Sequence, residues 1–362
     1  MINNRIFNFA AGPAVMPVPV LEEAQRDLLA LPGVGMSVME ISHRSKTFED
    51  ILNQAISDIR ELAGVPSHYK IFLLQGGASL QFSMVPMNLL TPGTVADYID
   101  TGSWARKAIK EAGHVGKVNV AATTKGENYA RIPEQAEIKS TPVAAYVHMT
   151  SNNTIEGTEW KALPEAGSAP LVSDASSDIF SRPIDVSRHA LIYAGAQKNL
   201  GPSGVTLVIL REDLLARSQD ALPTMLNYRV HSDNNSLYNT PNTFGIYLLG
   251  LTVKWLKSLG GLTEITKLNE RKAAKLYAEI DRSGFYRGTA QKSSRSLMNV
   301  TFRLATEELE KLFVKEATAA NLDGLKGHRD VGGMRASIYN AFPEQGVDAL
   351  VEFMRDFERK RG

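Results

Sequence analysis

A lysine and an aspartate near the middle of the chain form the residue pair with the clearest chemical potential. Lys198 lies in a glycine-bounded turn, YAGAQKNLGPSG, and Asp174 ends the apolar run at 171–174. Side chains at the carboxyl ends of neighbouring parallel strands meet at one edge of a sheet, so the amine and the acid can face one another. An amine can form a Schiff base with an aldehyde, and a carboxylate can keep a pyridine nitrogen protonated. The pair therefore suits a pyridine cofactor held through a carbonyl carbon.

Such a cofactor also needs a stacking ring and an anchor for a phosphate. Trp104 opens a helix expected at 103–112, directly after a strand expected at 95–100. Gly77, Ala78 and Ser79 lie in a glycine-rich turn between a strand and a helix, where backbone N–H groups can bind a phosphate. Each feature alone is weak, because a tryptophan usually packs in a core and this turn carries neither a GxGxxG fingerprint nor a P-loop lysine. Their order on consecutive strand ends is what favours one site.

The elements that would position these residues alternate along the chain. Short apolar runs predict strands at 70–74, 95–100, 117–122, 144–150, 171–174, 191–194 and 205–210. Helical spacing of apolar residues recurs between and around them, at 19–31, 48–62, 103–112 and 244–259. This alternation predicts an α/β fold, with a large domain built on a mostly parallel, seven-stranded sheet flanked by helices.

The last third of the chain has a different pattern. A helix expected at 263–281 is followed by a β-α-β-α order at 297–304, 306–320, 334–339 and 346–360, which predicts a smaller α+β domain. We therefore expect a large cofactor-binding domain at 16–258 and a small domain made of 1–15 and 259–362. The polar segment at 227–243 has too little hydrophobicity to fold on itself, and we expect an irregular arm that packs against a partner.

Composition excludes several classes of function. The 362 residues are 43% hydrophobic and 22% charged, with a net charge of +1, which argues against a nucleic-acid or membrane surface. The chain contains no cysteine, so disulfides, thiolate zinc sites and cysteine nucleophiles are excluded. No metal site is expected. Because no signal peptide or membrane span is recognisable, we expect a cytoplasmic location.

Several longer motifs resemble one family. The sequence is similar to the phosphoserine aminotransferases, which are fold-type-I enzymes dependent on pyridoxal 5'-phosphate. The resemblance runs essentially end to end, through FNFAAGPAVMP, ISHRS, QGGASLQF, TGSWA, SNNTIEGT, SDASSDIFSRP, YAGAQKNLGPSG, YNTPNTF and GHRDVGGMRASIYN.

The resemblance implies roles around the cofactor ring. Lys198 would bind the cofactor covalently and act as the general acid and base, and Asp174 would pair with the pyridine nitrogen. Trp104 would stack on the ring, and Thr154 would lie near its oxygen substituent.

The resemblance also implies how the cofactor phosphate is held and how the chain assembles. Ala78, Ser79 and Gln197 would hold the phosphate from one subunit. Asn239 and Thr240 would reach it from the neighbouring subunit, which makes the active unit a homodimer with shared active sites.

The implied reaction moves an amino group from glutamate to 3-phosphohydroxypyruvate, giving 2-oxoglutarate and O-phosphoserine in a ping-pong cycle. The 4-phosphohydroxythreonine step of vitamin B6 synthesis is also compatible with the resemblance. One pocket must then hold a phosphate and a carboxylate in turn, for which arginine and histidine are suitable. The resemblance assigns His43, Arg44, His328 and Arg329 to this pocket and Arg335 to the α-carboxylate.

One departure and three alternatives stand beside this assignment. Some members of the family carry an arginine where this chain has Ser79, so the four remaining residues would carry more of the substrate's charge. A serine–pyruvate or alanine–glyoxylate aminotransferase would not need the cluster of His43, Arg44, His328 and Arg329. A cysteine desulfurase needs a catalytic cysteine, which the chain lacks. A cofactor-free binding protein would not need Lys198, Asp174 and Trp104 together.

Overall fold

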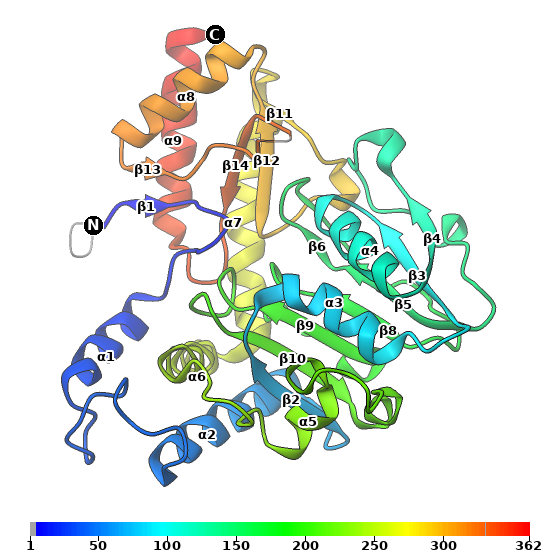
Figure 1. The fold of residues 1–362 in the computed structure, drawn as a ribbon. Helices are drawn as coiled ribbons and strands as arrows, with labels where there is room; N and C mark the ends of the chain where they lie inside the picture. The colour runs from blue at the N-terminus through cyan, green and yellow to red at the C-terminus, as the bar shows by residue number, and fades with distance from the viewer. Residues whose placement is uncertain (1–4, 330) are drawn as a thin grey trace.

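A seven-stranded sheet forms the centre of the computed structural model, which describes residues 5–329 and 331–362 (Figure 1). Its strands, in spatial order, are β2 (Tyr69–Leu74), β10 (Thr206–Arg211), β9 (Leu191–Gly195), β8 (Leu171–Asp174), β5 (Ala144–Thr150), β3 (Val95–Asp100) and β4 (Lys117–Thr123). Strand β10 runs antiparallel to both β2 and β9, whereas the other adjacent pairs are parallel. The predicted mostly parallel sheet is confirmed.

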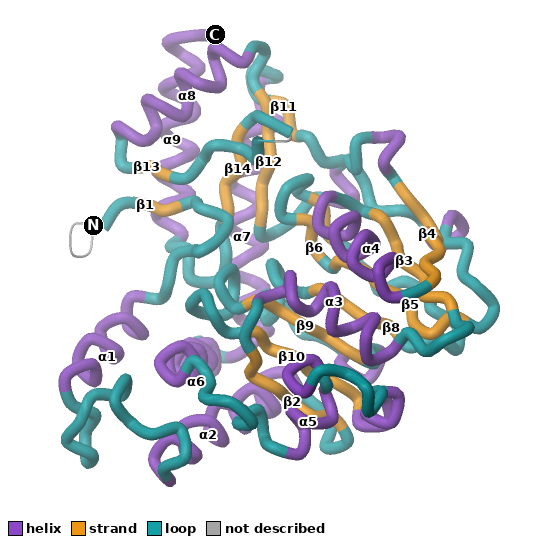
Figure 2. Tube along the Cα trace, in the orientation of Figure 1, coloured by secondary structure: helices purple, strands orange, loops and turns teal. Residues whose placement is uncertain are grey.

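Helices cover both faces of this sheet, as Figure 2 shows by the orange strands between purple helices. One face packs against α1 (Val18–Leu29), α2 (Lys46–Ala63), α6 (Thr243–Ser258) and the start of α7 (Gly261–Ser283). The other face packs against α3 (Gly77–Leu89), α4 (Ser103–Val115) and α5 (Tyr228–Asp233). The side chains of β2 enter the two cores in alternation, with Ile71 and Leu73 in the first core and Phe72 and Leu74 in the second. Burial on both faces explains why the strand is apolar from Ile71 to Leu74.

The C-terminal part has its own core, built on a three-stranded antiparallel sheet of β11 (Arg287–Gly288), β12 (Asn299–Arg303) and β14 (Met334–Ser337). Helices α7, α8 (Glu307–Ala319) and α9 (Glu344–Arg361) contribute to this core. The N-terminal strand β1 (Phe7–Asn8) pairs with β13 (Leu322–Asp323), and the two lie side by side near the N label in Figure 1. Phe9 is fully buried in the same core.

This arrangement agrees in outline with a small domain that includes the N-terminus. The domain limits at 16–258 and at 1–15 with 259–362 stay a prediction, and residues 1–4 lie outside the described part of the chain. Within that part, no helix combines the length and apolar character that crossing a membrane requires.

The segment at 227–243 differs from its prediction, because its first third is a helix that packs on its own chain. Tyr228 in α5 is fully buried, and its hydroxyl donates to Oε1 of Gln81 at 2.5 Å. The Asn227 side chain caps the helix by accepting the Arg229 N–H. An irregular stretch remains at 237–242, so the expected irregular structure is wrong for α5 and confirmed for these residues, while their packing against a partner stays a prediction.

A buried lysine ties the long helix α7 to the connection between β14 and α9. Lys272 is fully buried, and its Nζ donates to the carbonyl oxygens of Ile338 (2.9 Å), Tyr339 (2.6 Å) and Phe342 (3.2 Å). Buried carbonyl oxygens need donors, because leaving them without one costs their full desolvation energy. Lys272 thus donates the hydrogen bonds that water would otherwise have to supply to these three carbonyl oxygens.

Replacing Lys272 with methionine is expected to lower the free energy of unfolding by about 2 kcal/mol or more, because three carbonyls lose a shared donor. Lys275→Met, on the same helix, is the matched control: Lys275 is half-exposed and pairs with Asp348 and Glu344, and such pairs contribute about 0–1 kcal/mol. Urea denaturation of both variants measures the difference. Equal stability of the two variants would contradict this role of Lys272.

Candidate active site

A polar cavity of about 230 Å³ lies at the carboxyl-terminal edge of the seven-stranded sheet. The turn before α3, the start of α4, the end of β8 and the turn after β9 all border it. Its lining includes the predicted residues Ala78, Ser79, Trp104, Asp174, Gln197 and Lys198. The structure therefore brings together six residues from four separate parts of the sequence, at the sheet edge where the topology favours a ligand.

Lys198 projects its amine toward the residues that the sequence grouped with it. Its Nζ donates to Oγ1 of Thr154 at 2.6 Å and lies 5.0 Å from the centroid of the Trp104 ring. Burial of the amine lowers the pKa of Lys198 to about 8, while the charge of Asp174 opposes this shift and that of Arg335 adds to it. At neutral pH a minor but appreciable fraction of the amine is thus unprotonated, which suits a group that takes up and gives back a proton.

Asp174 is held by a residue that the sequence analysis did not single out. Its Oδ1 accepts the backbone N–H (3.0 Å) and the hydroxyl (2.6 Å) of Ser176, whose Oγ in turn accepts the N–H of Gly195 at 3.0 Å. Burial raises the pKa of Asp174, and the Ser176 hydroxyl and Lys198 oppose that shift. Because both donors occupy Oδ1, the second oxygen is left to meet a ring nitrogen. A serine two residues after an aspartate is the local pattern that could have revealed this contact.

The turn before α3 is suited to a phosphate. Helix α3 begins at Gly77, so Gly77, Ala78 and Ser79 form its first turn and do not precede it as the sequence predicted. Its N-cap, Gly76, has a φ of 91° and no side chain to cap the helix. The first N–H groups of a helix have no acceptor within the helix, so those of Gly77, Ala78 and Ser79 can point at an anion.

The chemical groups around this cavity match those that pyridoxal 5'-phosphate needs. The cavity offers an amine, a carboxylate with one free oxygen, an aromatic ring and a helix N-terminus. The indole Nε1 of Trp104 is buried and has no hydrogen-bond partner among the described residues, although a buried indole N–H usually finds one. No group of three or more His, Asp or Glu side chains that could hold a metal ion occurs among residues 5–329 and 331–362.

Arg335 connects this cavity to a second one. Its Nη1 lies 3.4 Å from the carbonyl oxygen of Thr154, and burial lowers the pKa of its guanidinium. Arg335 and His328 line the neighbouring cavity of about 540 Å³. Two of the five predicted substrate-binding residues therefore lie together, beside the residue that contacts Lys198.

The remaining predicted residues do not line either cavity. His43 and Arg44 precede α2 and contact one another, with Nε of Arg44 3.4 Å from Nε2 of His43. Arg329 is exposed. The carbonyl oxygen of Thr240 accepts a hydrogen bond from Nε2 of Gln75 at 3.3 Å, and the neighbouring Asn239 borders a separate small cavity. A single chain thus gathers Trp104, Asp174 and Lys198 in one cavity and leaves these five residues outside it.

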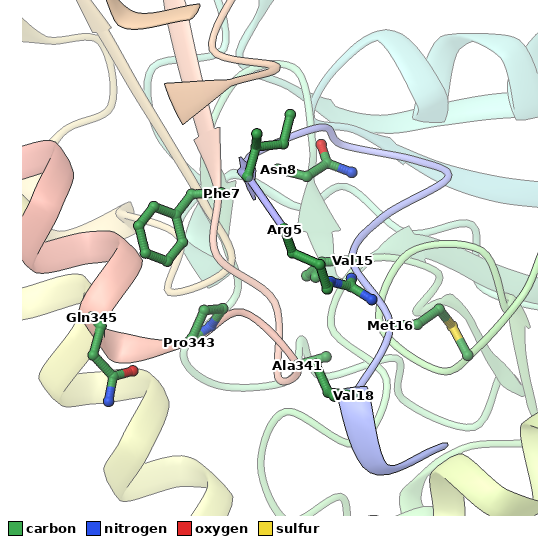
Figure 3. A pocket seen from close by; sticks show the side chains of 10 residues that line it. Arg5, Phe7, Asn8, Val15, Met16, Val18, Ala341, Pro343 and Gln345 are labelled. Carbon is green, nitrogen blue, oxygen red and sulfur yellow. The ribbon is translucent and has the colours of Figure 1, made fainter. Parts of the chain in front are cut away.

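A further cavity, of about 360 Å³, lies under the N-terminal segment and shares no lining residue with the cavity of Lys198 (Figure 3). Its labelled side chains include Phe7, Val15, Met16 and Pro343, which are apolar, with Arg5 as a charged side chain beside them. This lining contains no lysine and no carboxylate, so it lacks the amine and the acid that the cavity of Lys198 brings together, and the latter is the candidate active site.

Comparison with known proteins agrees with this geometry. Residues 6–350 match the family described as aminotransferase class-V. The phosphoserine aminotransferase of Desulfatibacillum aliphaticivorans is 55% identical over 363 residues, covering 100% of both chains.

Solved structures show the same likeness. The phosphoserine aminotransferase from Bacillus circulans subsp. alkalophilus superposes with a TM-score of 0.98 at 53% identity, over 99% of this chain and 100% of that one. The pyridoxal-phosphate-bound phosphoserine aminotransferase from Trichomonas vaginalis gives a TM-score of 0.93 at 38% identity, over 97% of this chain and 100% of that one.

The pKa of Lys198 can be measured in the cofactor-free protein. We expect its reaction with trinitrobenzenesulfonate to accelerate with a midpoint near pH 8, because burial favours the free amine and only that form reacts. Asp174→Asn should move the midpoint below pH 8, since the substitution removes the charge that favours the ammonium form. Peptide mapping after timed labelling gives the rate at Lys198. A midpoint near 10.5, the ordinary value for a lysine, would contradict the desolvated environment.

Proposed function

We infer that this chain, which belongs to the aminotransferase class-V family and within it to the phosphoserine aminotransferases, transfers an amino group between glutamate and 3-phosphohydroxypyruvate with pyridoxal 5'-phosphate as its cofactor. The product is O-phosphoserine, an intermediate of serine biosynthesis. The observation that carries this conclusion is the convergence of Lys198, Asp174 and Trp104 on one cavity, in a chain that matches phosphoserine aminotransferases over its whole length.

Bound pyridoxal 5'-phosphate supplies an aldehyde carbon and an electron-withdrawing ring, which make the α-hydrogen of an amino acid acidic. We propose that Lys198 anchors the cofactor and, once a substrate amine replaces it, moves this proton with its Nζ. The depressed pKa supports this role, because a base with a pKa of about 8 is partly deprotonated at neutral pH. Thr154 accepts a hydrogen bond from the same Nζ and so limits the directions in which the amine can point.

The other residues of the cavity are proposed to orient the ring. Asp174 would face the pyridine nitrogen and stabilise its protonated form, with Ser176 holding the carboxylate in place. Trp104 would lie against the ring face, and the first turn of α3 with Gln197 would receive the phosphate. The support for these roles is that every one of these side chains borders the same cavity.

Recognition of the substrate is proposed to depend on arginine and histidine. Arg335 would bind the α-carboxylate, which its place beside Thr154 supports. His328 and Arg329 would bind the phosphate of phosphoserine or the side-chain carboxylate of glutamate, together with His43 and Arg44. Ser79 stands where some relatives have an arginine, so these four would carry the charge that the missing arginine would otherwise share.

We propose that the active unit is a homodimer. Asn239 and Thr240 border no part of the Lys198 cavity of their own chain, which supports a role at the phosphate of a neighbouring subunit. His43 and Arg44 line neither cavity of this chain, so the same assembly would have to bring them to a site. A cytoplasmic location, and activity on the 4-phosphohydroxythreonine precursor, remain predictions from the sequence.

Replacing Arg329 with alanine is expected to raise the KM for phosphoserine about 10- to 100-fold, because one charge-assisted hydrogen bond contributes about 1.5–3 kcal/mol. Affinity for the cofactor should stay at the parental level. Arg359→Ala, an exposed arginine on α9, is the control, and steady-state kinetics with phosphoserine and 2-oxoglutarate provides the measurement. An unchanged KM in Arg329→Ala would remove this residue from the phosphate site.

Shared sites can be tested by mixing two inactive variants. Lys198→Ala and the double variant Asn239→Ala/Thr240→Ala should each show little activity as homodimers. In a hybrid dimer, one site carries both defects and the other has an intact Lys198 facing an intact Asn239 and Thr240. Co-refolding should therefore restore activity to about a quarter of the wild-type sites in a statistical mixture. Hybrid dimers that form and stay inactive would show that the sites are not shared in this way.

A further inference from the structure

One buried carboxylate beside the active site has no part in the chemistry described so far. Glu156 lies two residues after Thr154, in the turn between β6 (Asn152–Asn153) and β7 (Thr158–Glu159), and is 7% exposed. Its Oε1 accepts the backbone N–H of Ser103 at 2.7 Å and the Ser103 hydroxyl at 2.8 Å. Ser103 is the first residue of α4, and Trp104 follows it.

Helix α4 needs this acceptor because its own sequence supplies none. The N-cap position is Gly102, which makes no side-chain cap. Serine, threonine, aspartate or asparagine normally accepts one of the free N–H groups at this place. Glu156 provides that oxygen from a distant part of the chain, and a carboxylate is also favoured by the partial positive charge of a helix N-terminus.

The fit between Gly102 and Glu156 is close. A Cβ atom at position 102 would lie 2.6 Å from both Cδ and Oε2 of Glu156, nearer than non-bonded atoms approach. The backbone of Glu156 is fixed from the other side, since its carbonyl oxygen accepts the Thr301 hydroxyl at 3.2 Å. The carboxylate therefore has little freedom to move away from α4.

The turn that contains Glu156 also contacts Lys198. Thr154 contacts Nζ of Lys198 directly, and Trp104 places its ring 5.0 Å from that atom. Glu156 links these two contacts, because its backbone continues the Thr154 turn and its side chain holds the residue before Trp104. A cap from the N-cap residue of α4 itself would leave the helix free to shift relative to Thr154. The cap from Glu156 instead fixes the start of α4 relative to the Thr154 turn.

We propose that Glu156 is a positioning residue, whose carboxylate fixes the first turn of α4 and thereby holds the Trp104 indole in place against Lys198. The inference rests on the proposed function in one respect, the stacking of Trp104 on the cofactor ring. Positive charges face the Glu156 carboxylate from three places, namely Arg106 on α4, Arg335 on β14 and Lys198 in the turn after β9. Burial raises the pKa of Glu156, and the two bonds from Ser103 together with Arg106 oppose that shift.

The test uses the protein labelled with 5-fluorotryptophan, which reports separately on Trp104, Trp160 and Trp255 by fluorine NMR in the absence of cofactor. Glu156→Ala should shift or broaden the Trp104 resonance and leave that of Trp255, which lies on α6, unchanged. Glu156→Gln should resemble the parent, because the amide oxygen can accept both bonds from Ser103. Glu127→Ala is the control, because it removes an exposed carboxylate from the cavity of about 540 Å³ that Glu156 also lines. It should leave the Trp104 resonance unchanged.

Gly102→Ala is an independent test, because it keeps Glu156 while the added Cβ atom pushes the carboxylate away from Ser103. It should move the Trp104 resonance as Glu156→Ala does, and this arm also decides the question if Glu156→Ala does not fold. Cofactor binding should weaken up to about tenfold in both variants, the usual size of a lost stacking contact.

An unchanged Trp104 resonance in Gly102→Ala or in folded Glu156→Ala would overturn the proposal. So would a perturbed Trp104 resonance in Glu156→Gln equal to that in Glu156→Ala. The NMR result does not depend on catalysis. A displaced Trp104 in a protein without aminotransferase activity would thus refute the proposed function and leave the role of Glu156 intact.

Discussion

The structure depends on bringing an amine and a carboxylate out of water at one edge of a sheet. Removing a charge from water is costly, so Lys198 and Asp174 shift their pKa values in opposite directions, toward their neutral forms. Specific hydrogen bonds limit this cost, with Thr154 accepting from the amine and Ser176 donating to the acid. A pair held in this way suits a pyridine ring that needs an amine at its aldehyde carbon and a carboxylate at its nitrogen.

The topology of the sheet makes that edge available. Strands β8 and β9 are parallel, so Asp174 and the turn after Gly195 lie at the same end of the sheet. Strand β10 then returns antiparallel to β9, which makes the Lys198 turn part of a hairpin with no crossover to carry it away. Helices on both faces keep the strands dry and leave their carboxyl ends as the place where polar groups can meet.

Much of this arrangement could be predicted from the sequence, and the remainder shows where local patterns fail. Strands β3, β5 and β8 were predicted to the residue, because strands buried on both faces are rich in apolar residues and their polar residues lie mainly at their ends. The antiparallel direction of β10 carries no such signal, and the helix around Tyr228 was missed because that segment is polar apart from a few buried side chains. The contact of Glu156 with Ser103 joins residues far apart in the sequence, so only folding creates it, whereas the contact of Ser176 with Asp174 is local and was overlooked. His43, Arg44, Asn239 and Thr240 line neither the Lys198 cavity nor the cavity of Arg335, so their roles in a site shared between subunits stay predictions.

The central claim is that Lys198 is the residue that carries the cofactor, with Asp174 and Trp104 placed around it. The most direct measurement is borohydride reduction of the holoenzyme, followed by proteolysis and mass spectrometry of the peptides. The account predicts a phosphopyridoxyl group on the peptide that contains Lys198 and its absence from the Lys198→Ala protein. Labelling instead at Lys107, whose Nζ lies 4.1 Å from the Trp104 ring centroid, or at any other lysine, would contradict it.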